Sequence, residues 1–581
     1  MSEATQGPAA PAGERPTAWR THTCGELREA HLGVKVTLCG QVHARPESRI
    51  WDLRDGNGIT RVTLASGVGD EELASREMKV PSLETVVQVK GEVRRRASED
   101  PINPTGSVHV AVTAVEFLSF ASTPLVFDPH AEASAADRIR HRYLSLRSQK
   151  MHQTLRWRTR FVAALRGALA ERHFEDIETP LLADKWTSEQ TEAYLAVREN
   201  GKMFALPGQR AVHGSLLMAA GFDRVFEVAR RFRRKSAYNA WQQPEFNVLD
   251  ASIAYAGEDD LHRVVDGSAQ RPPTVLTYDD AWLRFGTGCP DLRFSLEIAD
   301  ATPHAVHAKT TALRDLRFSG GAVRALRVPS SAERLAEFKL GPLVAGSKGA
   351  ALHKLTLGPD GRPAEAAEPP LDTMLAAALV HELRVGPSDT LFVAVAEQAV
   401  RAAALLGKVR LAVGQELKLS ERKHALVRVV RLPYVEIDPV SGNSRPRAEP
   451  LAKLAGDDDL PPGDAAALRA RAFHLVLDGV NVGGGAVRNH DPHAQGRLFE
   501  SLRIPAKEAD DRYGRLQQAL RFGVPPHARF ALGVDRLVAL LLGLPAIHEV
   551  IPLPKTQDGF DPLTRSPWPI DNNVVRALLG Q

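Results

Sequence analysis

Apolar and polar residues alternate in short runs along the first part of the chain, up to about residue 115. This period of two is typical of strands with one buried face. The runs lie at residues 34–38, 59–64, 86–89 and 108–112. Asp55-Gly56-Asn57-Gly58 stands directly before the second run and is a strong signal for a tight turn. The pattern predicts about five strands in roughly ninety residues, which is enough for a small closed barrel.

The flanks of this segment have a different composition. Residues 1–16 are rich in Ala, Pro and Gly and are predicted to be a disordered leader. The barrel is expected over residues 17–115, and a linker over residues 116–135. A barrel of this size is typical of the OB-fold, which often binds single-stranded nucleic acid. The alternation alone supports the barrel and says little about a ligand.

A helical period replaces the alternation after residue 136. Residues 174–182 follow the helix as a predicted strand that Pro180 ends or bends. Two further strands are expected around residues 226–232 and 246–253. The predicted amphipathic helix rests on apolar side chains that recur every four residues, at Trp157, Phe161, Leu165 and Leu169.

The second half of the chain mixes helical and strand signals. Residues 288–422 show no convincing catalytic cluster and are predicted to form an inserted α+β domain. Residues 473–477 read as a strand, and residues 531–541 as a strand, a turn and a buried helix. The chain is therefore assigned to the α+β multidomain class.

Composition and charge narrow the functional classes only slightly. The 581 residues exceed one hydrophobic core, so three or more domains are expected. The net charge of +4 neither requires nor excludes a nucleic acid partner. No apolar run is long enough to cross a membrane. Cys24, Cys39 and Cys289 are too widely spaced for a metal motif and suit a reducing compartment, so a cytoplasmic protein is expected.

The strongest candidate for ligand chemistry is a basic segment between two predicted strands. Arg230-Arg231-Phe232-Arg233-Arg234-Lys235 holds five cations in six residues. Arginine forks match phosphate oxygens, so a hairpin bend of this kind would attract a polyphosphate. No acidic residue lies between Arg230 and Gln243 to accept a hydrogen bond from the amino group of a base. A solvated basic hairpin without a ligand is the alternative interpretation.

Two features near the C-terminus could add to a phosphate site. Gly483-Gly484-Gly485 would let the backbone approach a ligand closely, although such a run also marks a bulge or a turn. Arg536 opens a strongly apolar helix, and a buried arginine needs an anionic partner. A phosphate would suit both the arginine and the helix N-terminus. A structural salt bridge with Asp535 or a neighbour would satisfy Arg536 as well.

Several motifs, taken in order, carry a family resemblance. They are Asp52-Leu53-Arg54-Asp55, Arg140-His141-Arg142-Tyr143-Leu144, Ile177-Glu178-Thr179-Pro180, Pro290-Asp291-Leu292-Arg293-Phe294, Val482-Gly483-Gly484-Gly485, His490-Asp491-Pro492 and Gly533-Val534-Asp535-Arg536-Leu537. Together they resemble the bacterial-type aspartyl-tRNA synthetases, which are class II aminoacyl-tRNA synthetases. The resemblance covers residues 18–581. It implies an anticodon-binding-like barrel, a catalytic-like domain over residues 136–287 and 423–556, a GAD-like insertion over residues 288–422 and a C-terminal extension over residues 557–581.

The resemblance also implies a fold and a reaction. The fold is an antiparallel sheet of six or seven strands flanked by helices, in a homodimer. The reaction joins an amino acid to ATP, which gives an aminoacyl-adenylate, and then passes the acyl group to tRNA. Such catalysis rests mainly on positioning and on charge neutralisation by arginines and magnesium. ATP, tRNA and an amino acid are therefore the expected partners.

Four residues match positions to which the family gives roles. Arg233 aligns with the arginine that holds the α-phosphate of ATP, and Arg536 with the arginine that holds the distal phosphates. Glu189 lies in the loop that grips the substrate. Arg488 aligns with the arginine that reads the aspartate side chain. The resemblance thus implies that the phosphate-binding arginines and two substrate-binding residues are retained.

Other positions depart from the family pattern. Lys235 stands where a glutamate reads the adenine amino group, and Gly214 where a lysine binds the substrate carboxylate. At the magnesium site of the family, Asn481 and Arg431 replace two acidic residues. No metal-binding residues are therefore predicted. Each unit charge about 5 Å from a cation contributes roughly 3 kcal/mol at an effective dielectric of about 20. Binding of Mg²⁺ is therefore expected to be strongly disfavoured.

The barrel departs from the family pattern as well. Gly40-Gln41-Val42 lacks the tryptophan of the family, and the arginine-rich loop after it is shortened. RNA contact is expected through Arg45, Arg49 and Arg54 and through Arg94-Arg95-Arg96, although these side chains could also be merely solvated. The resemblance therefore does not extend to the anticodon contacts.

Three functional interpretations stay open. The favoured one is a paralogue that keeps the fold, the dimer and ATP binding, while ordinary aspartylation is lost or strongly impaired and the amino acid is unknown. The second is a functional aspartate–tRNA ligase with atypical site residues. The third is a non-catalytic RNA-binding dimer.

Overall fold

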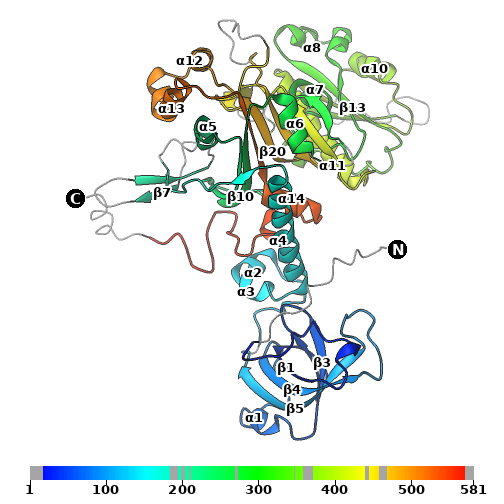
Figure 1. The fold of residues 1–581 in the computed structure, drawn as a ribbon. Helices are drawn as coiled ribbons and strands as arrows, with labels where there is room; N and C mark the ends of the chain where they lie inside the picture. Colours follow the sequence, from blue (N-terminus) through cyan, green and yellow to red (C-terminus); the bar gives the residue numbers. More distant parts are fainter. Residues whose placement is uncertain are drawn as a thin grey trace. The chain divides into compact units, whose positions relative to one another are not determined.

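The computed structural model places the chain in two compact units, Met1–Leu155 and Arg156–Gln581 (Figure 1). None of the helices it describes combines the length and the apolar character needed to span a membrane. The described residues are 17–122, 124–183, 194–197, 203–208, 211–267, 272–345, 347, 349–357, 371–438, 444–456 and 467–569.

The first unit is built on a closed barrel with the strand order β1-β2-β3-β5-β4 (Figure 1). Its interior is filled by the apolar residues of the alternating runs, among them Leu38, Val62 and Val110, and by Trp51, which is 1% exposed. The predicted five-stranded barrel is confirmed. The strands are β1 (Lys35–Glu47), β2 (Ile50–Arg54), β3 (Ile59–Leu64), β4 (Val86–Arg95) and β5 (Val108–Ser119).

The predicted tight turn joins β2 to β3. Oδ1 of Asp55 accepts hydrogen bonds from the backbone nitrogens of Asn57 and Gly58 at 2.7 and 3.1 Å. The aspartate therefore satisfies the backbone donors of the turn, which the alternation pattern alone could not show. The helices of this part of the chain are η1 (Glu29–His31), α1 (Asp70–Ala74), α2 (Ala135–Arg140), α3 (Arg142–Ser145) and the start of α4 (Gln149–Ala170).

An eight-stranded sheet with the order β11-β16-β19-β20-β21-β10-β9-β6 forms the centre of the second unit (Figure 1). The edge strands β11 and β6 run parallel to their neighbours, and the pairs between them are antiparallel. Six antiparallel strands thus form the expected sheet, and one parallel strand extends it at each edge. The strands are β6 (Glu175–Asp176), β9 (Arg224–Phe232), β10 (Glu245–Ala254), β11 (Thr274–Thr277), β16 (Leu426–Val430), β19 (Ala472–Leu477), β20 (Val480–Arg488) and β21 (His527–Gly533).

The predicted strand over residues 174–182 is mostly wrong, since only two residues pair with β9. Beyond them, the backbone nitrogen and Oγ1 of Thr179 donate to the carboxylate of Glu227 at 3.0 and 2.7 Å. Pro180 has no N–H to donate to a strand neighbour. A side chain thus captures the backbone donor that would otherwise extend the sheet.

Helices pack on the large sheet through one hydrophobic core. Leu249 and Phe530 of the sheet lie in it with Val538, and Trp157 and Phe161 of α4 pack against it. The predicted amphipathic helix is confirmed by this packing. The other helices of this part are α5 (Ala211–Ala219), α6 (Glu258–Asp266), α7 (Tyr278–Phe285), α12 (Pro492–Ser501), α13 (Ala506–Leu520), α14 (Val534–Leu541) and η5 (Ile547–Glu549).

A separate four-stranded sheet with the order β12-β13-β15-β14 lies within the segment predicted as an insertion (Figure 1). Its strands are β12 (Ala299–Asp300), β13 (Ala322–Val328), β14 (Ala350–Thr356) and β15 (Thr390–Ala396). Its helices are η3 (Thr302–His307), α8 (Thr311–Asp315), η4 (Leu316–Phe318), α9 (Gly341–Val344), α10 (Thr373–Glu382) and α11 (Ala399–Glu416). The boundaries at residues 288 and 422 stay predictions.

Two short hairpins complete the described structure. One pairs β7 (Tyr194–Val197) with β8 (Met203–Leu206), and the other pairs β17 (Val435–Ile437) with β18 (Ser444–Pro446). The chain leaves β18 and returns toward the end of β20, where the backbone nitrogen of Lys453 donates to the oxygen of Val487 at 2.7 Å. This return places the residues after β18 beside the large sheet.

Candidate active site

A cavity of about 280 Å³ opens on the large sheet of the second unit. Residues from β9, β10, β19, β20 and β21 line it, together with the loop between β9 and β10 and the start of α14. Its described lining includes the six arginines Arg231, Arg233, Arg447, Arg488, Arg529 and Arg536. The only carboxylates in the described lining are Asp250, Glu449 and Asp535, so the wall carries an excess of positive charge.

The triple glycine forms part of this wall in β20. A Cβ atom on Gly483 would lie 2.2 Å from the backbone oxygen of Ala531, and one on Gly484 would lie 2.3 Å from that of Phe473. Side chains are therefore excluded here by the neighbouring strands. A register shift between Leu475 and Val476 of β19 lies opposite the start of this run. The bulge that the glycines predicted is thus present, while close approach of this backbone to a ligand stays a prediction.

Half of the arginines belong to an alternating row of charges on the sheet. Nη2 of Arg231 donates to Glu227 at 2.9 Å and to Asp250 at 3.0 Å. Arg529 donates twice to Asp250, at 2.7 and 2.6 Å. Burial acts to raise the pKa of Asp250, but the guanidiniums of Arg529 and Arg231 outweigh it and hold that pKa below its ordinary value. Arg231 is therefore a structural cation that the basic hairpin pattern wrongly grouped with ligand-facing residues.

The row continues to the predicted substrate-reading arginine. Nη1 of Arg529 lies 3.6 Å from Oε2 of Glu449. The same oxygen accepts a short hydrogen bond from Nη2 of Arg488, which is 2% exposed. Arg488 thus lines the cavity as the resemblance implied, but its guanidinium is already engaged by a carboxylate of the chain itself.

Arg233 and Arg536 stand apart from this row. Neither forms a salt bridge with a residue that the structure describes. Arg233 lies over the ring of Phe246, with 4.9 Å between its guanidinium carbon and the ring centroid. Arg536 donates to the backbone oxygens of Asn481 at 2.6 Å and Trp241 at 3.0 Å. Burial lowers the pKa of Arg536 to about 10, and the like charge of Arg233 acts in the same direction.

The salt bridge between Asp535 and Arg536, which was the structural alternative, is not formed. Arg158 takes the carboxylate of Asp535 instead, at 2.5 Å, and the backbone nitrogen of Asn247 donates to it at 2.8 Å. Arg536 therefore faces the cavity without the partner that lies next to it in the sequence. This arrangement fits an anionic ligand between Arg233 and Arg536.

The expected magnesium position offers no suitable ligand set. Oδ1 of Asn481 accepts a hydrogen bond from the backbone nitrogen of Gly483 at 3.0 Å. His474 of β19 also lines the cavity, and its Nδ1 lies 3.0 Å from Nη2 of Arg447. Burial, helped by Arg447, holds the pKa of His474 well below its usual range. Mg²⁺ requires oxygen ligands, chiefly carboxylates, so these residues do not fit it.

Arg431 is not where the family pattern placed it. It lies exposed at φ 59° and is not one of the residues that line the cavity. The bend at the end of β16 carries its side chain away, while the next residue, Leu432, lines the cavity. The expectation of a cation from Arg431 beside Asn481 is therefore wrong, and Arg447 is the cation that lines the cavity near His474 instead.

The two other departures lie outside the cavity lining. Nζ of Lys235 donates to Oε1 of Gln242 at 3.3 Å, and Gln242 itself lines the cavity. Gly214 on α5 lies against β10, where an added Cβ would be 2.4 Å from Oγ of Ser252. A side chain at this position would require the hydroxyl of Ser252 to rotate away. Glu189 lies outside the described residues.

The candidate RNA contacts of the barrel are largely engaged by the protein. Nη1 of Arg45 donates to the backbone oxygen of Pro81 at 2.6 Å, and Arg49 pairs with Asp70 at 2.5 Å. Arg54 is 4% exposed. The expectation that Arg54 contacts RNA is wrong, since both of its Nη atoms are used inside the unit.

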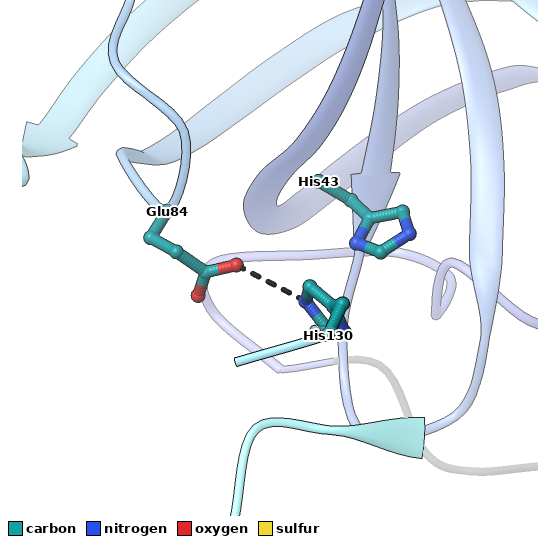
Figure 2. Close-up of side chains that lie close together, drawn as sticks. All are labelled: His43, Glu84 and His130. Atoms are coloured by element: carbon teal, nitrogen blue, oxygen red, sulfur yellow. Dashed lines mark hydrogen bonds and ion pairs between the residues drawn. The ribbon is translucent and has the colours of Figure 1, made fainter. Parts of the chain in front are cut away.

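Glu84 is the centre of that buried network. Figure 2 shows its carboxylate beside His130 and His43, and the three side chains have potential ligand atoms within 4.8 Å of one another. Nη2 of Arg54 donates to both carboxylate oxygens at 2.9 and 2.8 Å, and Nη1 of Arg147 donates to Oε2 at 2.9 Å. Two guanidiniums already neutralise the only carboxylate of this trio, so the cluster does not fit a divalent cation.

Sequence reasoning missed three residues of the main cavity. His474 had a usable signal, because it is a polar residue inside an otherwise apolar predicted strand. Arg447 and Glu449 had none, because they follow a short hairpin where no periodicity applies. Backbone hydrogen bonds fix both segments: the nitrogen of Arg447 donates to the oxygen of Tyr434 at 2.9 Å, and Leu451, two residues after Glu449, accepts from the nitrogen of Asn489 at 3.1 Å.

Comparison with known proteins identifies the family. A model of the class II tRNA synthetases (D, K and N) matches residues 134–557. An aspartate–tRNA(Asp/Asn) ligase of Rhodopirellula baltica is 34% identical over 589 residues, which cover 96% of this chain and 98% of that protein. An aspartate–tRNA ligase of Clostridium acetobutylicum is 31% identical over 583 residues, which cover 96% of this chain and 97% of that protein.

Solved structures agree in fold. The asparaginyl-tRNA synthetase of Entamoeba histolytica, in complex with asparaginyl-adenylate, covers 92% of this chain and 98% of its own, with a TM-score of 0.54 and 15% identity. The asparaginyl-tRNA synthetase of Pyrococcus horikoshii gives the same coverage and TM-score at 16% identity. The motifs, the central sheet and these matches agree, and the chain belongs to the class II tRNA synthetases of the D, K and N group.

Proposed function

We propose that this protein is a synthetase-like paralogue that binds ATP in the main cavity and in which ordinary aspartylation is lost or strongly impaired. The observation that carries the proposal is the pair Arg233 and Arg536. Both line the cavity, they repel each other, and neither has a carboxylate partner among the described residues. A polyphosphate would bring the negative charge that this part of the wall lacks.

The retained arginines support the nucleotide half of the family reaction. Arg233 would hold the α-phosphate, with its guanidinium kept over Phe246, and Arg536 would hold the distal phosphates. Each charge-assisted hydrogen bond of this kind contributes about 1.5 to 3 kcal/mol. The Entamoeba and Pyrococcus relatives hold asparaginyl-adenylate, so an adenylate is the expected product of the nominal reaction here.

Impaired aspartylation follows from the rest of the cavity. Asn481, His474 and Arg447 replace the acidic surroundings that Mg²⁺ needs, and Arg488 is already paired with Glu449. ATP binding would then depend on arginine charge more than on a metal held by the protein. The activated amino acid would differ from aspartate, and tRNA as acceptor, homodimer formation and a cytoplasmic location belong to the proposal as family expectations.

Pyrophosphate exchange tests this function directly. The full-length protein would be assayed with ATP, Mg²⁺ and each of the twenty amino acids, and calorimetry with a non-hydrolysable ATP analogue would run beside it. We expect the analogue to bind and aspartate to give no robust exchange. Robust aspartate-dependent exchange would defeat the proposal, and exchange with a different amino acid would identify its substrate.

A working aspartate–tRNA ligase is the second candidate. Identity of 34% over nearly the whole chain to an enzyme of that name favours it. A third candidate, a non-catalytic RNA-binding dimer, predicts tight tRNA binding without nucleotide binding. Labelled tRNA in the same calorimetric series separates these candidates.

A further inference from the structure

The amino-acid end of the cavity contains hydrogen-bonding atoms that the protein leaves unused. Nε and Nη1 of Arg488 are buried and make no hydrogen bond within the described structure, and the same holds for Oε1 of Glu449. Buried polar atoms are nearly always paired, so such atoms beside a cavity call for an explanation. Here two donors and one acceptor lie together in the wall.

Glu449 is held in this place by the backbone around it. The backbone oxygen of Glu449 accepts a hydrogen bond from the backbone nitrogen of Ala452 at 2.9 Å. The backbone nitrogen of Asn489 donates to the oxygen of Leu451 at 3.1 Å. The segment that carries Glu449 is thereby fastened to the end of β20, the strand that carries Arg488. The pair is a built feature of the wall and not a chance contact of flexible side chains.

The charges at this end of the cavity are already balanced. Arg231, Arg529 and Arg488 alternate with Glu227, Asp250 and Glu449. A ligand carboxylate bound to Arg488 would add an unmatched negative charge, and the carboxylate of Glu449 would repel it. A neutral ligand group would add none. Charge therefore selects against the acidic side chain that the family arginine normally reads.

We propose that Glu449 is a specificity-determining residue that replaces the substrate carboxylate on Arg488 and selects an uncharged amino-acid side chain. That side chain carries an N–H or O–H donor for Oε1 of Glu449 and an acceptor oxygen for Nη1 or Nε of Arg488. A carboxamide supplies both groups on adjacent atoms, and a hydroxyl supplies both on one atom. The inference rests on the proposed adenylate-binding function and deepens it.

Two non-reactive adenylate analogues test the inference by binding alone. They are the sulfamoyl-adenosine esters of aspartate and of asparagine, which differ only in carboxylate against carboxamide. Calorimetry would compare the full-length protein with E449Q and E449A, and with E508Q as a control, since Glu508 pairs with Arg512 at 2.9 Å on α13. A non-hydrolysable ATP analogue would be titrated into every variant.

We expect the unchanged protein to bind the carboxamide analogue about ten- to a hundredfold more tightly than the carboxylate analogue, the size of one charge-assisted hydrogen bond. E449A should reverse the preference, E449Q should reduce it, and E508Q should leave it intact. E449Q keeps the shape of the wall, so this variant still tests the role of the Glu449 charge if E449A fails to fold.

Failure of the inference and failure of the function are distinguishable. If the ATP analogue binds but the unchanged protein prefers the carboxylate, or if E449Q and E449A leave the preference unaltered, Glu449 does not set specificity. If the ATP analogue itself fails to bind, the proposed function and this inference fall together.

Discussion

Arg158 and Asp535 form an ion pair between α4 and α14, two helices of the second unit that are far apart in the sequence. Nη1 of Arg158 lies 2.5 Å from Oδ1 of Asp535, and the side chains are 13% and 3% exposed. The carboxylate is also a hydrogen-bond acceptor for the backbone nitrogen of Asn247. Arg158 thus removes the nearest competitor for the guanidinium of Arg536, which leaves that guanidinium to a ligand.

Loss of Arg158 should destabilise the protein. Arg158→Ala leaves the buried carboxylate of Asp535 without its cation, and breaking a buried pair in this way costs about 3 kcal/mol. Arg166→Ala is the matched control on the same helix, because Arg166 and Asp176 lie 3.4 Å apart with 51% and 40% exposure. An exposed pair of that kind contributes at most about 1 kcal/mol. Urea unfolding would measure both, and equal losses would contradict the assignment.

Arg536 should matter for nucleotide binding. Arg536→Ala removes one of the two cavity cations that lack a described carboxylate partner, and we expect the affinity for an ATP analogue to fall about tenfold or more. Arg515→Ala is the control, because Arg515 lies on α13 outside the cavity lining and its hydrogen bond to Gln518, at 3.4 Å, is exposed to solvent. Calorimetry measures both. Unchanged affinity in Arg536→Ala would show that the phosphates bind elsewhere.

Removal of Mg²⁺ should change nucleotide affinity only slightly. The cavity wall beside Asn481 offers His474 and Arg447, which cannot replace carboxylates as ligands of a hard cation. We expect the affinity for the ATP analogue in EDTA to stay within about threefold of that in Mg²⁺, well under one tenfold step of 1.4 kcal/mol. Parallel titrations check this. A loss of a hundredfold or more in EDTA would mean that the protein holds the ion.

The glycines of β20 should not tolerate side chains. Gly483→Ala would place a Cβ 2.2 Å from the backbone oxygen of Ala531, so β20 or β21 would have to move. We expect a loss of about 2 kcal/mol or more, typical of overpacking. Gly496→Ala on α12 is the control, because no atom lies within 4 Å of its added Cβ. Its helix should gain up to about 1 kcal/mol. Thermal unfolding would compare the two variants.

Stability should depend on Glu84 in acid. Burial acts to raise the pKa of Glu84, but His130, Arg54 and Arg147 outweigh it and lower this pKa to about 2. A depressed pKa means that the carboxylate stabilises the folded state above its unfolded pKa of about 4.3. This contribution is lost progressively as the pH falls from there toward 2.

Glu84→Gln isolates that contribution. We expect the variant to be about 3 kcal/mol less stable at neutral pH, because it leaves the buried guanidinium of Arg54 and the partly exposed guanidinium of Arg147 without their carboxylate. The difference from the unchanged protein should shrink below about pH 4.3. Urea unfolding at a series of pH values measures how this difference in the free energy of unfolding depends on pH. Glu29→Gln serves as the control, since its pair with Arg95 is 49% and 57% exposed. A difference that is constant with pH would contradict the assignment.

Elements with a regular period could be predicted well from the sequence. The strands around Trp51 and the helix around Trp157 bury one face each, so the pattern of apolar residues reports them directly. The pattern predicted the strand β9 but not its burial, because Glu227 and Arg231 lie on the face that a period-two pattern assigns to solvent and are nevertheless buried. Ion pairs across neighbouring strands compensate those charges, and a single sequence does not show which strands are neighbours.

Candidate site residues followed the same division. Arg536 and Arg488 lie on regular elements and Arg233 directly follows β9; all three belong to aligned motifs, and the fold brings them to one cavity. Arg431 and Glu449 lie in irregular segments, where one bend or one backbone hydrogen bond decides the direction of a side chain. The family pattern therefore misplaced Arg431 and gave no hint of Glu449.

The six-membered row from Glu227 to Arg488 couples the stability of its members to one another. Each interior charge touches two of opposite sign, so replacing one residue leaves two neighbours uncompensated. Arg488 is the terminal member at the cavity and has one partner in the row, Glu449, so a ligand can take the place of that partner while Arg529 keeps its pair with Asp250. Substitutions that alter substrate preference are therefore expected at Glu449, whereas substitutions of the other charges in the row are expected to cost stability.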